Sequence, residues 1–436
     1  MELLHPKYDM AVTETSSHCL SNHKRGAMGH RRMLSRGLVP LIPLLPFTLL
    51  TACRPPAQGP GEATPGVRQL APGLQHEVRA DPRGPWKFHI VEIDLTNPAL
   101  SLDAVRAKDA LQGRERTSSM AKRLQSDTSR VRVAVNADFF DLATGENENN
   151  QVLAGEWWKG LPLTDSPYDT YDNVHGQVAI DPAGGLTFGR FILDGRAWTR
   201  RGAVPILSVN SKPAGRYEGT ALYTPRFGAS TPTDTGRVAE LRLRPIGMRG
   251  DTLLYTATDT ANARSGGPIP RDGAVLVGYG DRAEGVARLS RADTLRVHLD
   301  TWPRSTSRRA PKAVLGGWPL LLQDGENVAA RAATLEGTIS RNAEARHPRT
   351  AIAVSRSGQT AWLVTVDGRA TSSVGMTLVE LAEFLRTLGA WNALNFDGGG
   401  STTMVIDGKV VNAPTDQTGE REVGNALVIR ERGKGR

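Results

Sequence analysis

Asp-Gly pairs divide the chain into short segments, and such pairs are among the strongest local signals for a tight hairpin turn. They begin at residues 194, 272, 324, 367, 397 and 407. Short apolar runs rich in β-branched residues lie between them, for example at 87–95, 131–137, 274–277 and 295–299. This alternation predicts a chain built mainly of short strands joined by turns.

Helical periodicity is convincing in only two segments, residues 116–126 and 378–388. The second segment is preceded by Thr377 and Glu380, which have the spacing of a capping box, and Gly389 is placed to end the helix. The sequence therefore predicts an α+β fold, a β-rich mixed sheet with few helices.

The composition argues against several classes of protein. The chain has 436 residues and a net charge of +9, but its Lys and Arg residues are scattered, so we expect no nucleic-acid partner. Two cysteines are too few for a disulfide framework or a thiolate zinc cluster.

The N-terminal segment has the pattern of an export signal. Arg31, Arg32 and Arg36 precede an apolar stretch at 38–50, which ends in Leu50-Thr51-Ala52-Cys53. This ending resembles a bacterial lipobox and predicts lipidation of Cys53. The alternative is an ordinary secretory signal with an incidental cysteine. We expect a protein of the bacterial cell envelope, anchored to a membrane through lipid and facing the periplasm or the exterior.

The domain organisation follows from the same segment. Residues 1–52 are an N-terminal extension plus signal peptide, and 53–80, rich in Pro and Gly, are expected to be a tether. Residues 81–432 are expected to form the folded domain.

The order of strands and helix in the C-terminal third predicts where polar residues lie close together. Strands at 350–355 and 361–366 form a hairpin, and the helix then leads to a third strand at 391–396. A strand–helix–strand crossover predicts parallel pairing of that third strand. His347, Arg349, Asp367 and Asp397 would then meet at one sheet edge, where open α/β sheets usually bind ligands.

Glycines and a cation at this edge indicate an anion site. In Asp397-Gly398-Gly399-Gly400-Ser401 the three glycines would let backbone N–H groups converge on an anion. The alternative is a flexible hairpin turn, but three glycines are entropically costly for a turn alone, which favours a ligand loop. Arg349 suits a phosphate, or a structural salt bridge. His347 is expected to be a helper or a surface residue rather than a catalyst.

A second polar group follows the strand at 131–137. Asn136 and Asp138 alternate onto one face, and the loop 145–150 is rich in Glu and Asn. Its oxygens could bind calcium, but a solvated loop is the expected state. Trp157 and Trp158 could stack on a sugar or cover the core.

These motifs together resemble the phosphodiester glycosidase family over roughly residues 85–430. The residues that resemble it are Asn136-Ala137-Asp138-Phe139-Phe140-Asp141, Gly316-Gly317-Trp318-Pro319-Leu320-Leu321, His347-Pro348-Arg349-Thr350-Ala351, Val366-Asp367-Gly368-Arg369, Gly375-Met376-Thr377, Asn395-Phe396-Asp397-Gly398-Gly399-Gly400-Ser401-Thr402 and Asn412-Ala413-Pro414. The resemblance implies that 81–432 is a catalytic domain that hydrolyses a sugar-1-phosphodiester with an N-acetylglucosamine-like sugar.

The resemblance also implies roles for the candidate residues. Asp397 or Asp138 would act as nucleophile or base at the anomeric carbon, and Asp367 would orient hydroxyls or share the acid–base task. Arg349 and Gly398, Gly399, Gly400 and Ser401 would bind phosphate, and Asn136 a sugar hydroxyl. No cofactor is required, although a divalent cation such as calcium could take part.

Two other functions stay open from the sequence. One is a metal-dependent phosphodiesterase with Asp138, Asp141, Asp367 and Asp397 as ligands. The other is a glycan-binding lipoprotein without catalysis.

Overall fold

A computed structural model describes residues 66–166, 173–213, 219–306, 310–337 and 345–433. The described residues belong to one compact unit. The predicted signal and Cys53 lie outside the described residues. No helix among the described residues is long and apolar enough to span a bilayer.

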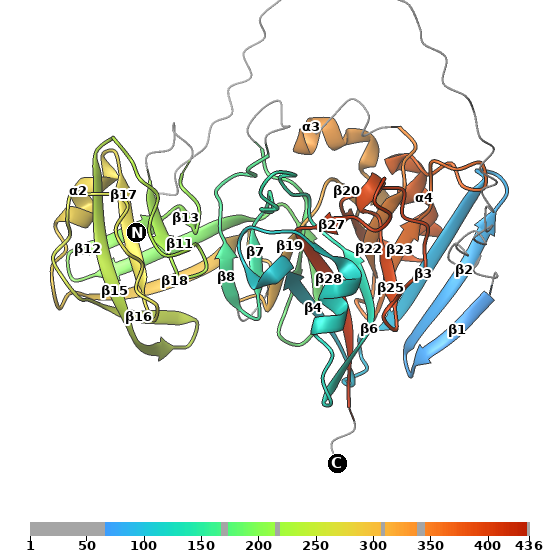
Figure 1. The fold of residues 1–436 in the computed structure, drawn as a ribbon, viewed down its shortest axis with the longest axis horizontal. Helices are drawn as coiled ribbons and strands as arrows, with labels where there is room; N and C mark the ends of the chain where they lie inside the picture. The colour runs from blue at the N-terminus through green and yellow to red at the C-terminus, as the bar shows by residue number, and fades with distance from the viewer. Residues whose placement is uncertain (1–65, 167–172, 214–218, 307–309, 338–344, 434–436) are drawn as a thin grey trace, which may run out of the picture. The chain divides into compact units, whose positions relative to one another are not determined.

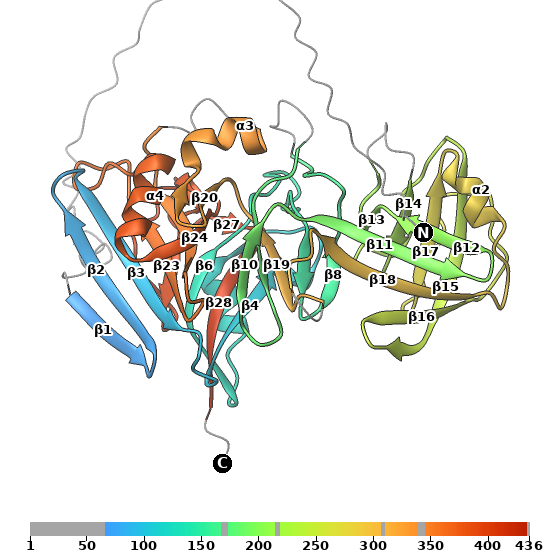
Figure 2. The ribbon, with the colours of Figure 1, turned by 180° about the vertical axis from the view of Figure 1, so that it is seen from behind.

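The sheet that positions the candidate site has eight strands. Its order is β1-β2-β3-β23-β22-β24-β20-β21 (Figures 1 and 2). The strands are β1 Gly66–Ala71, β2 Leu74–Asp81, β3 Trp86–Asp94, β20 Leu320–Gln323, β21 Glu326–Asn327, β22 Arg349–Ser355, β23 Thr360–Val366 and β24 Ala390–Asn395. Strands from the two ends of the described chain thus pair side by side, β3 with β23.

The third strand of the C-terminal region pairs differently from the prediction. β24 is antiparallel to β22, and β22 separates it from β23. The expected parallel pairing is therefore wrong. Helix α4 (Leu378–Thr387) connects β23 to β24, but β22, the first strand of the hairpin, lies between these two strands. β23 and β24 still run in the same direction, so their carboxyl ends and the start of β22 lie at the same end of the strands. This end of the sheet is the edge at which the candidate site lies.

The two faces of this sheet are covered by different layers. The strands alternate, so Leu363 packs in one core and Trp362 and Val364 in another. The first core lies against a five-stranded antiparallel sheet of order β26-β25-β6-β28-β4. Its strands are β4 Leu100–Arg106, β6 Ser129–Asn136, β25 Met404–Ile406, β26 Lys409–Val410 and β28 Asn425–Arg432.

Helix α4 (Leu378–Thr387) covers the other face. Leu378, Leu381, Ala382 and Leu385 are buried in the second core. The capping box predicted from Thr377 and Glu380 is present, since each side chain bonds the backbone N–H of the other residue. The other helical prediction is confirmed as α1 (Thr117–Arg123). The remaining helices of the described residues are short: η1 Ala107–Asp109, α2 Arg282–Ala287, η2 Ala329–Arg331, α3 Ala332–Glu336 and η3 Gly399–Ser401.

Three further sheets complete the β-rich α+β fold that was predicted. A five-stranded sheet contains β7 Gln151–Leu153, β8 Glu156–Lys159, β9 Gln177–Ile180, β10 Leu186–Gly189 and β19 Ala313–Gly316. An eight-stranded sheet contains β11 Ile192–Thr199, β12 Gly202–Ile206, β13 Ser208–Val209, β14 Thr220–Tyr223, β15 Val238–Arg249, β16 Thr252–Ala257, β17 Ala274–Tyr279 and β18 Thr294–Trp302. A short pair joins β5 Glu115–Arg116 to β27 Glu422–Val423.

Two details of the sequence prediction are corrected. β1 and β2 lie in the range expected to be a tether, because Leu70, Leu74 and Val78 bury apolar side chains at the sheet edge. Asp194-Gly195 lies inside β11 rather than in a turn; a Cβ on Gly195 would lie 2.5 Å from the Ile206 carbonyl, so glycine is needed for close strand packing. The pairs at 324 and 407 do form tight turns, with positive φ at both residues.

Candidate active site

Two Asp-Gly loops pack against Pro348 at the shared edge of β22, β23 and β24. A Cβ on Gly368 would lie 2.7 Å from the Pro348 nitrogen, and one on Gly398 would lie 2.8 Å from its carbonyl oxygen. The Gly399 N–H donates to that same carbonyl at 2.8 Å. The structure thus brings Asp367, Arg349 and the 397–401 loop together, as the sequence predicts.

Asp397 is a partly buried carboxylate at the end of β24. Burial raises its pKa to about 6, although hydrogen bonding to Ser401, the charge of Arg421 and the Gly398 N–H lower it. The Ser401 hydroxyl in turn accepts from Arg421 Nη1 at 3.2 Å. A carboxyl with this pKa can change its protonation state near neutral pH, which suits acid–base or nucleophilic work.

Asn136 ties the second sheet to this loop. Its Nδ2 donates to the Asp397 carbonyl at 2.6 Å, and its Oδ1 accepts from Thr350 Oγ1 at 2.8 Å and from the Thr403 N–H at 3.0 Å. The side chain is fully buried. These bonds make Asn136 a positioning residue, in place of the sugar contact that the resemblance implies.

Asp138 follows β6 one residue after Ala137, whose carbonyl accepts the Asp397 N–H at 2.8 Å. Asn149 Nδ2 donates to the Asp138 carboxylate at 2.8 Å, and Asn425 Oδ1 accepts the Asp138 N–H at 2.9 Å. Burial raises the pKa of Asp138 to about 6, against the hydrogen bonds from Asn149 and the charges of His175 and Lys159. The site therefore contains a second carboxyl with a raised pKa.

The Gly-Gly-Trp-Pro segment, residues 316–319, lies next to the Asp138 carboxyl. A Cβ on Gly316 would lie 2.4 Å from Asp138 Oδ1, and one on Gly317 would lie 2.4 Å from the Asn395 carbonyl. Asn395 Nδ2 donates to the Trp318 carbonyl at 2.6 Å. Gly316 thus lets β19 lie close to Asp138, which is 2% exposed, and Gly317 lets the same segment lie close to the end of β24.

Asp367 is buried at the end of β23. Its Oδ1 accepts the Ala413 N–H at 2.9 Å, which accounts for the Asn412-Ala413-Pro414 motif at this edge. Burial raises its pKa, against that hydrogen bond. Ser373 Oγ donates to its carbonyl at 2.6 Å and anchors the following loop.

Arg349 is buried, and its guanidinium donates hydrogen bonds to backbone carbonyls of neighbouring segments. Its Nε donates to the Met376 carbonyl at 2.9 Å, and its Nη2 to the Ala345 carbonyl at 2.8 Å. Burial lowers its pKa to about 10. His347 pairs with Met376 through two backbone hydrogen bonds. These contacts give Arg349 and His347 roles in shaping the edge.

The glycine loop is not the open nest that the sequence predicts. The Gly399 N–H donates to the Pro348 carbonyl. The Ser401 N–H donates to the Gly398 carbonyl, within the 3₁₀ turn η3. The three glycines make room for protein neighbours instead. A Cβ on Gly399 would lie 2.9 Å from Arg369 Nη2, and one on Gly400 would meet Arg421.

Arg369 and Arg421 are thus site residues that the sequence reasoning missed. The Asp-Gly-Arg motif contained Arg369, but only the tertiary structure shows that its guanidinium reaches Gly399. Nothing local indicated Arg421, which lies twenty residues beyond Ser401 in the sequence. Asn149 was likewise hidden in a loop expected to be solvated.

The loop 145–150 is buried rather than solvated. Asn147, Glu148, Asn149 and Asn150 are each no more than 3% exposed. Lys159 Nζ donates to the Asn147 carbonyl at 2.7 Å and pairs with Glu146 at 2.9 Å. The Lys159 ammonium therefore binds two of the oxygens of this loop, the Asn147 carbonyl and the Glu146 carboxylate. Trp157 and Trp158 are also buried, which favours the core interpretation.

The four aspartates of the metal hypothesis do not come together. Asp141 accepts the N–H groups of Ala143 and Thr144 at 2.6 and 2.9 Å, as a turn cap. Across the described residues, no three His, Cys, Asp or Glu side chains form a group that could hold a metal ion.

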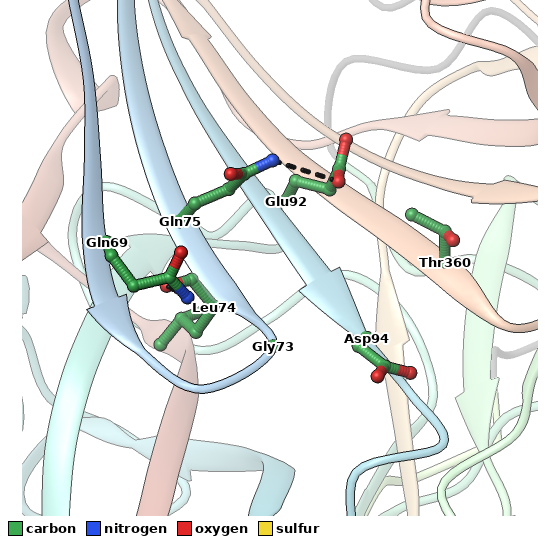
Figure 3. Close-up of a pocket in the computed structure, with 7 residues that line it drawn as sticks. All are labelled: Gln69, Gly73, Leu74, Gln75, Glu92, Asp94 and Thr360. Atoms are coloured by element: carbon green, nitrogen blue, oxygen red, sulfur yellow. Dashed lines mark hydrogen bonds between the residues drawn. The ribbon is translucent and has the colours of Figure 1, made fainter.

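A cavity in the described part of the chain lies away from the candidate site. It holds about 220 Å³ and is lined by Gln75, Glu92, Asp94 and Thr360, among others (Figure 3). Thr360 begins β23, whereas Asp367 follows its end. The cavity is therefore at the opposite sheet edge, and Gln75 already donates to Glu92 at 3.0 Å.

Residues 246–430 match the model of the phosphodiester glycosidase family, the family that the motifs resemble. The chain is 32% identical over 176 residues to the N-acetylglucosamine-1-phosphodiester alpha-N-acetylglucosaminidase of Bos taurus, covering 39% of this chain and 29% of the relative. The human protein of that name is 28% identical over 227 residues, covering 46% and 40%.

Solved structures share the fold. A protein from Synechocystis superposes with a TM-score of 0.64 at 26% identity, covering 85% of this chain and 64% of that one. A protein from Burkholderia pseudomallei gives 0.58 at 23% identity, over 79% and 74%. The matches to the curated relatives cover less than half of their length.

Proposed function

We propose that this protein hydrolyses a sugar-1-phosphodiester and releases an N-acetylglucosamine-like sugar. The observation that supports this most is Asp397, a partly exposed carboxyl with a pKa of about 6 at an edge where two arginines also lie. The curated relatives are named for that reaction. The bond that breaks joins the anomeric carbon to the phosphodiester oxygen; water adds to the carbon, and the phosphate leaves as a monoester.

Asp397 acts at the anomeric carbon in this proposal, as nucleophile or as the base for water. A phosphodiester is already a good leaving group, so charge stabilisation matters more than protonation. Asp138, which is more deeply buried, is the second carboxyl of the acid–base pair. Asp367 holds the 412–414 segment against the site and orients sugar hydroxyls.

Incubation of the full chain with UDP-N-acetylglucosamine or with a methyl phosphodiester of N-acetylglucosamine 1-phosphate tests the proposal. We expect sugar release that a chelator does not reduce. Because the attacking carboxylate must be ionised, kcat/KM should fall as the pH drops through about 6. Binding of the sugar without turnover would favour the glycan-binding alternative, and loss of activity on chelation would favour the metal-dependent one.

Membrane attachment is a separate proposal, because Cys53 lies outside the described residues. It rests on the lipobox-like sequence Leu50-Thr51-Ala52-Cys53. Wild-type protein should partition with membranes and be extracted by detergent. Cys53→Ala should move it to the soluble fraction or block processing. A wild-type protein recovered fully soluble, with an unmodified cysteine, would contradict the anchor.

A further inference from the structure

Arg369 is exposed at the tip of the loop that connects β23 to α4. Its backbone has φ 58°, in the left-handed region that residues other than glycine rarely adopt. Its guanidinium is directed at the glycine loop after Asp397, since Nη2 would lie 2.9 Å from a Cβ on Gly399. The side chain therefore lies against the loop that follows Asp397, the residue to which we assign the chemistry, at a position two residues along the chain from it.

The surrounding contacts hold this unfavourable backbone in place. The Val374 N–H donates to the Pro85 carbonyl at 3.0 Å, and Trp86 Nε1 donates to the Gly375 carbonyl at 2.9 Å. Ser373 Oγ bonds the Asp367 carbonyl. A strained residue persists only where its neighbours fix it, and such residues gather at functional sites.

The charge of Arg369 is not neutralised by the protein. Within the described ranges it forms no ion pair, and its only hydrogen-bond partner is Thr415 Oγ1, at 3.4 Å. Arg421, on the same loop's other side, is paired with Asp416 at 2.7 Å. Arg349 donates to two carbonyls in the buried edge. Arg369 thus has donors available to an anion, whereas Arg349 and Arg421 are bound by groups of the protein.

We propose that Arg369 binds the phosphate oxygens of the substrate and places the leaving group next to Asp397. This inference rests on the proposed function and names the residue that selects an anionic leaving group. A planar guanidinium can contact two phosphate oxygens at once. Gly399 has φ 59°, which glycine adopts readily, and its lack of a Cβ leaves the Arg369 guanidinium room to lie against the loop.

The sharpest variant is Arg369→Gly, because glycine adopts φ 58° without strain and the change removes the whole side chain with its guanidinium. It should fold at least as well as wild type, as thermal unfolding reports. Its kcat/KM for the methyl phosphodiester should fall about 10- to 100-fold, as expected for a lost charged hydrogen bond. Hydrolysis of a 4-nitrophenyl glycoside should change less than about twofold. Arg200→Ala, an exposed arginine on the β11–β12 turn, is the matched control.

The outcomes separate the two proposals. Equal losses on both substrates, or none on either, would overturn the phosphate role. If wild type hydrolyses neither substrate, the proposed function fails, and calorimetry with N-acetylglucosamine 1-phosphate then decides the role of Arg369. In that measurement Arg369→Gly should weaken binding at least about 10-fold, while Arg200→Ala should not; equal affinities would overturn the inference.

Discussion

Asp397→Asn should reduce hydrolysis of the phosphodiester by about 10²- to 10⁴-fold, because an amide can neither attack nor accept the proton. The aryl glycoside should lose activity equally, since the residue acts at the sugar whichever group leaves. Asp272→Asn, in an exposed Asp-Gly turn, is the matched control and should keep wild-type rates. An Asp397→Asn protein with more than a tenth of wild-type activity would exclude the role.

The same variant should be more stable than wild type at neutral pH. The folded-state pKa of Asp397, about 6, lies above its ordinary value of 3.8, so wild type loses stability as the pH rises between about 4 and 6. Asparagine has no charge to bury, so unfolding at pH 7.5 should cost about 1–3 kcal/mol more. The difference should vanish near pH 4. Denaturant unfolding at both pH values measures it, and equal midpoints at pH 7.5 would contradict the burial argument.

Arg106→Ala should be the most destabilising single change away from the chemistry, by about 3–5 kcal/mol. Arg106 is 1% exposed, and its guanidinium donates to the carbonyls of Ala110, Leu111, Gly145 and Gly424 and to Asn147 Oδ1. Removing it leaves buried acceptors without donors. The loop that carries Asn149, the partner of Asp138, would lose its support, so activity should fall as well.

Thermal unfolding compares this variant with Arg106→Lys and with the Arg200→Ala control. Lysine keeps the charge but cannot reach several carbonyls at once, so its Tm should lie between those of alanine and wild type. Arg200→Ala should have the same Tm as wild type. An Arg106→Ala Tm within about 2 °C of wild type would show that the network contributes little.

The sequence by itself determined the local elements around the site. The capping box at Thr377 and Glu380, the hairpin between β22 and β23 and the strand before Asp138 all depend on interactions within a few residues, which neighbouring side chains encode directly. The meeting of Asp367, Arg349 and Asp397 could also be predicted, because strand direction alone places them at one edge.

The tertiary structure decided which strands pair and what each polar group binds. β22 lies between β23 and β24, and no residue near the crossover encodes that neighbour. The loop 145–150 is polar in sequence yet buried, because Arg106, 41 residues before Asn147, and Lys159, 12 residues after it, supply donors. The glycines after Asp397 resembled an anion nest, but they make room for Arg369 and Arg421. Such contacts join residues far apart in the chain, and a local pattern carries no information about a distant partner.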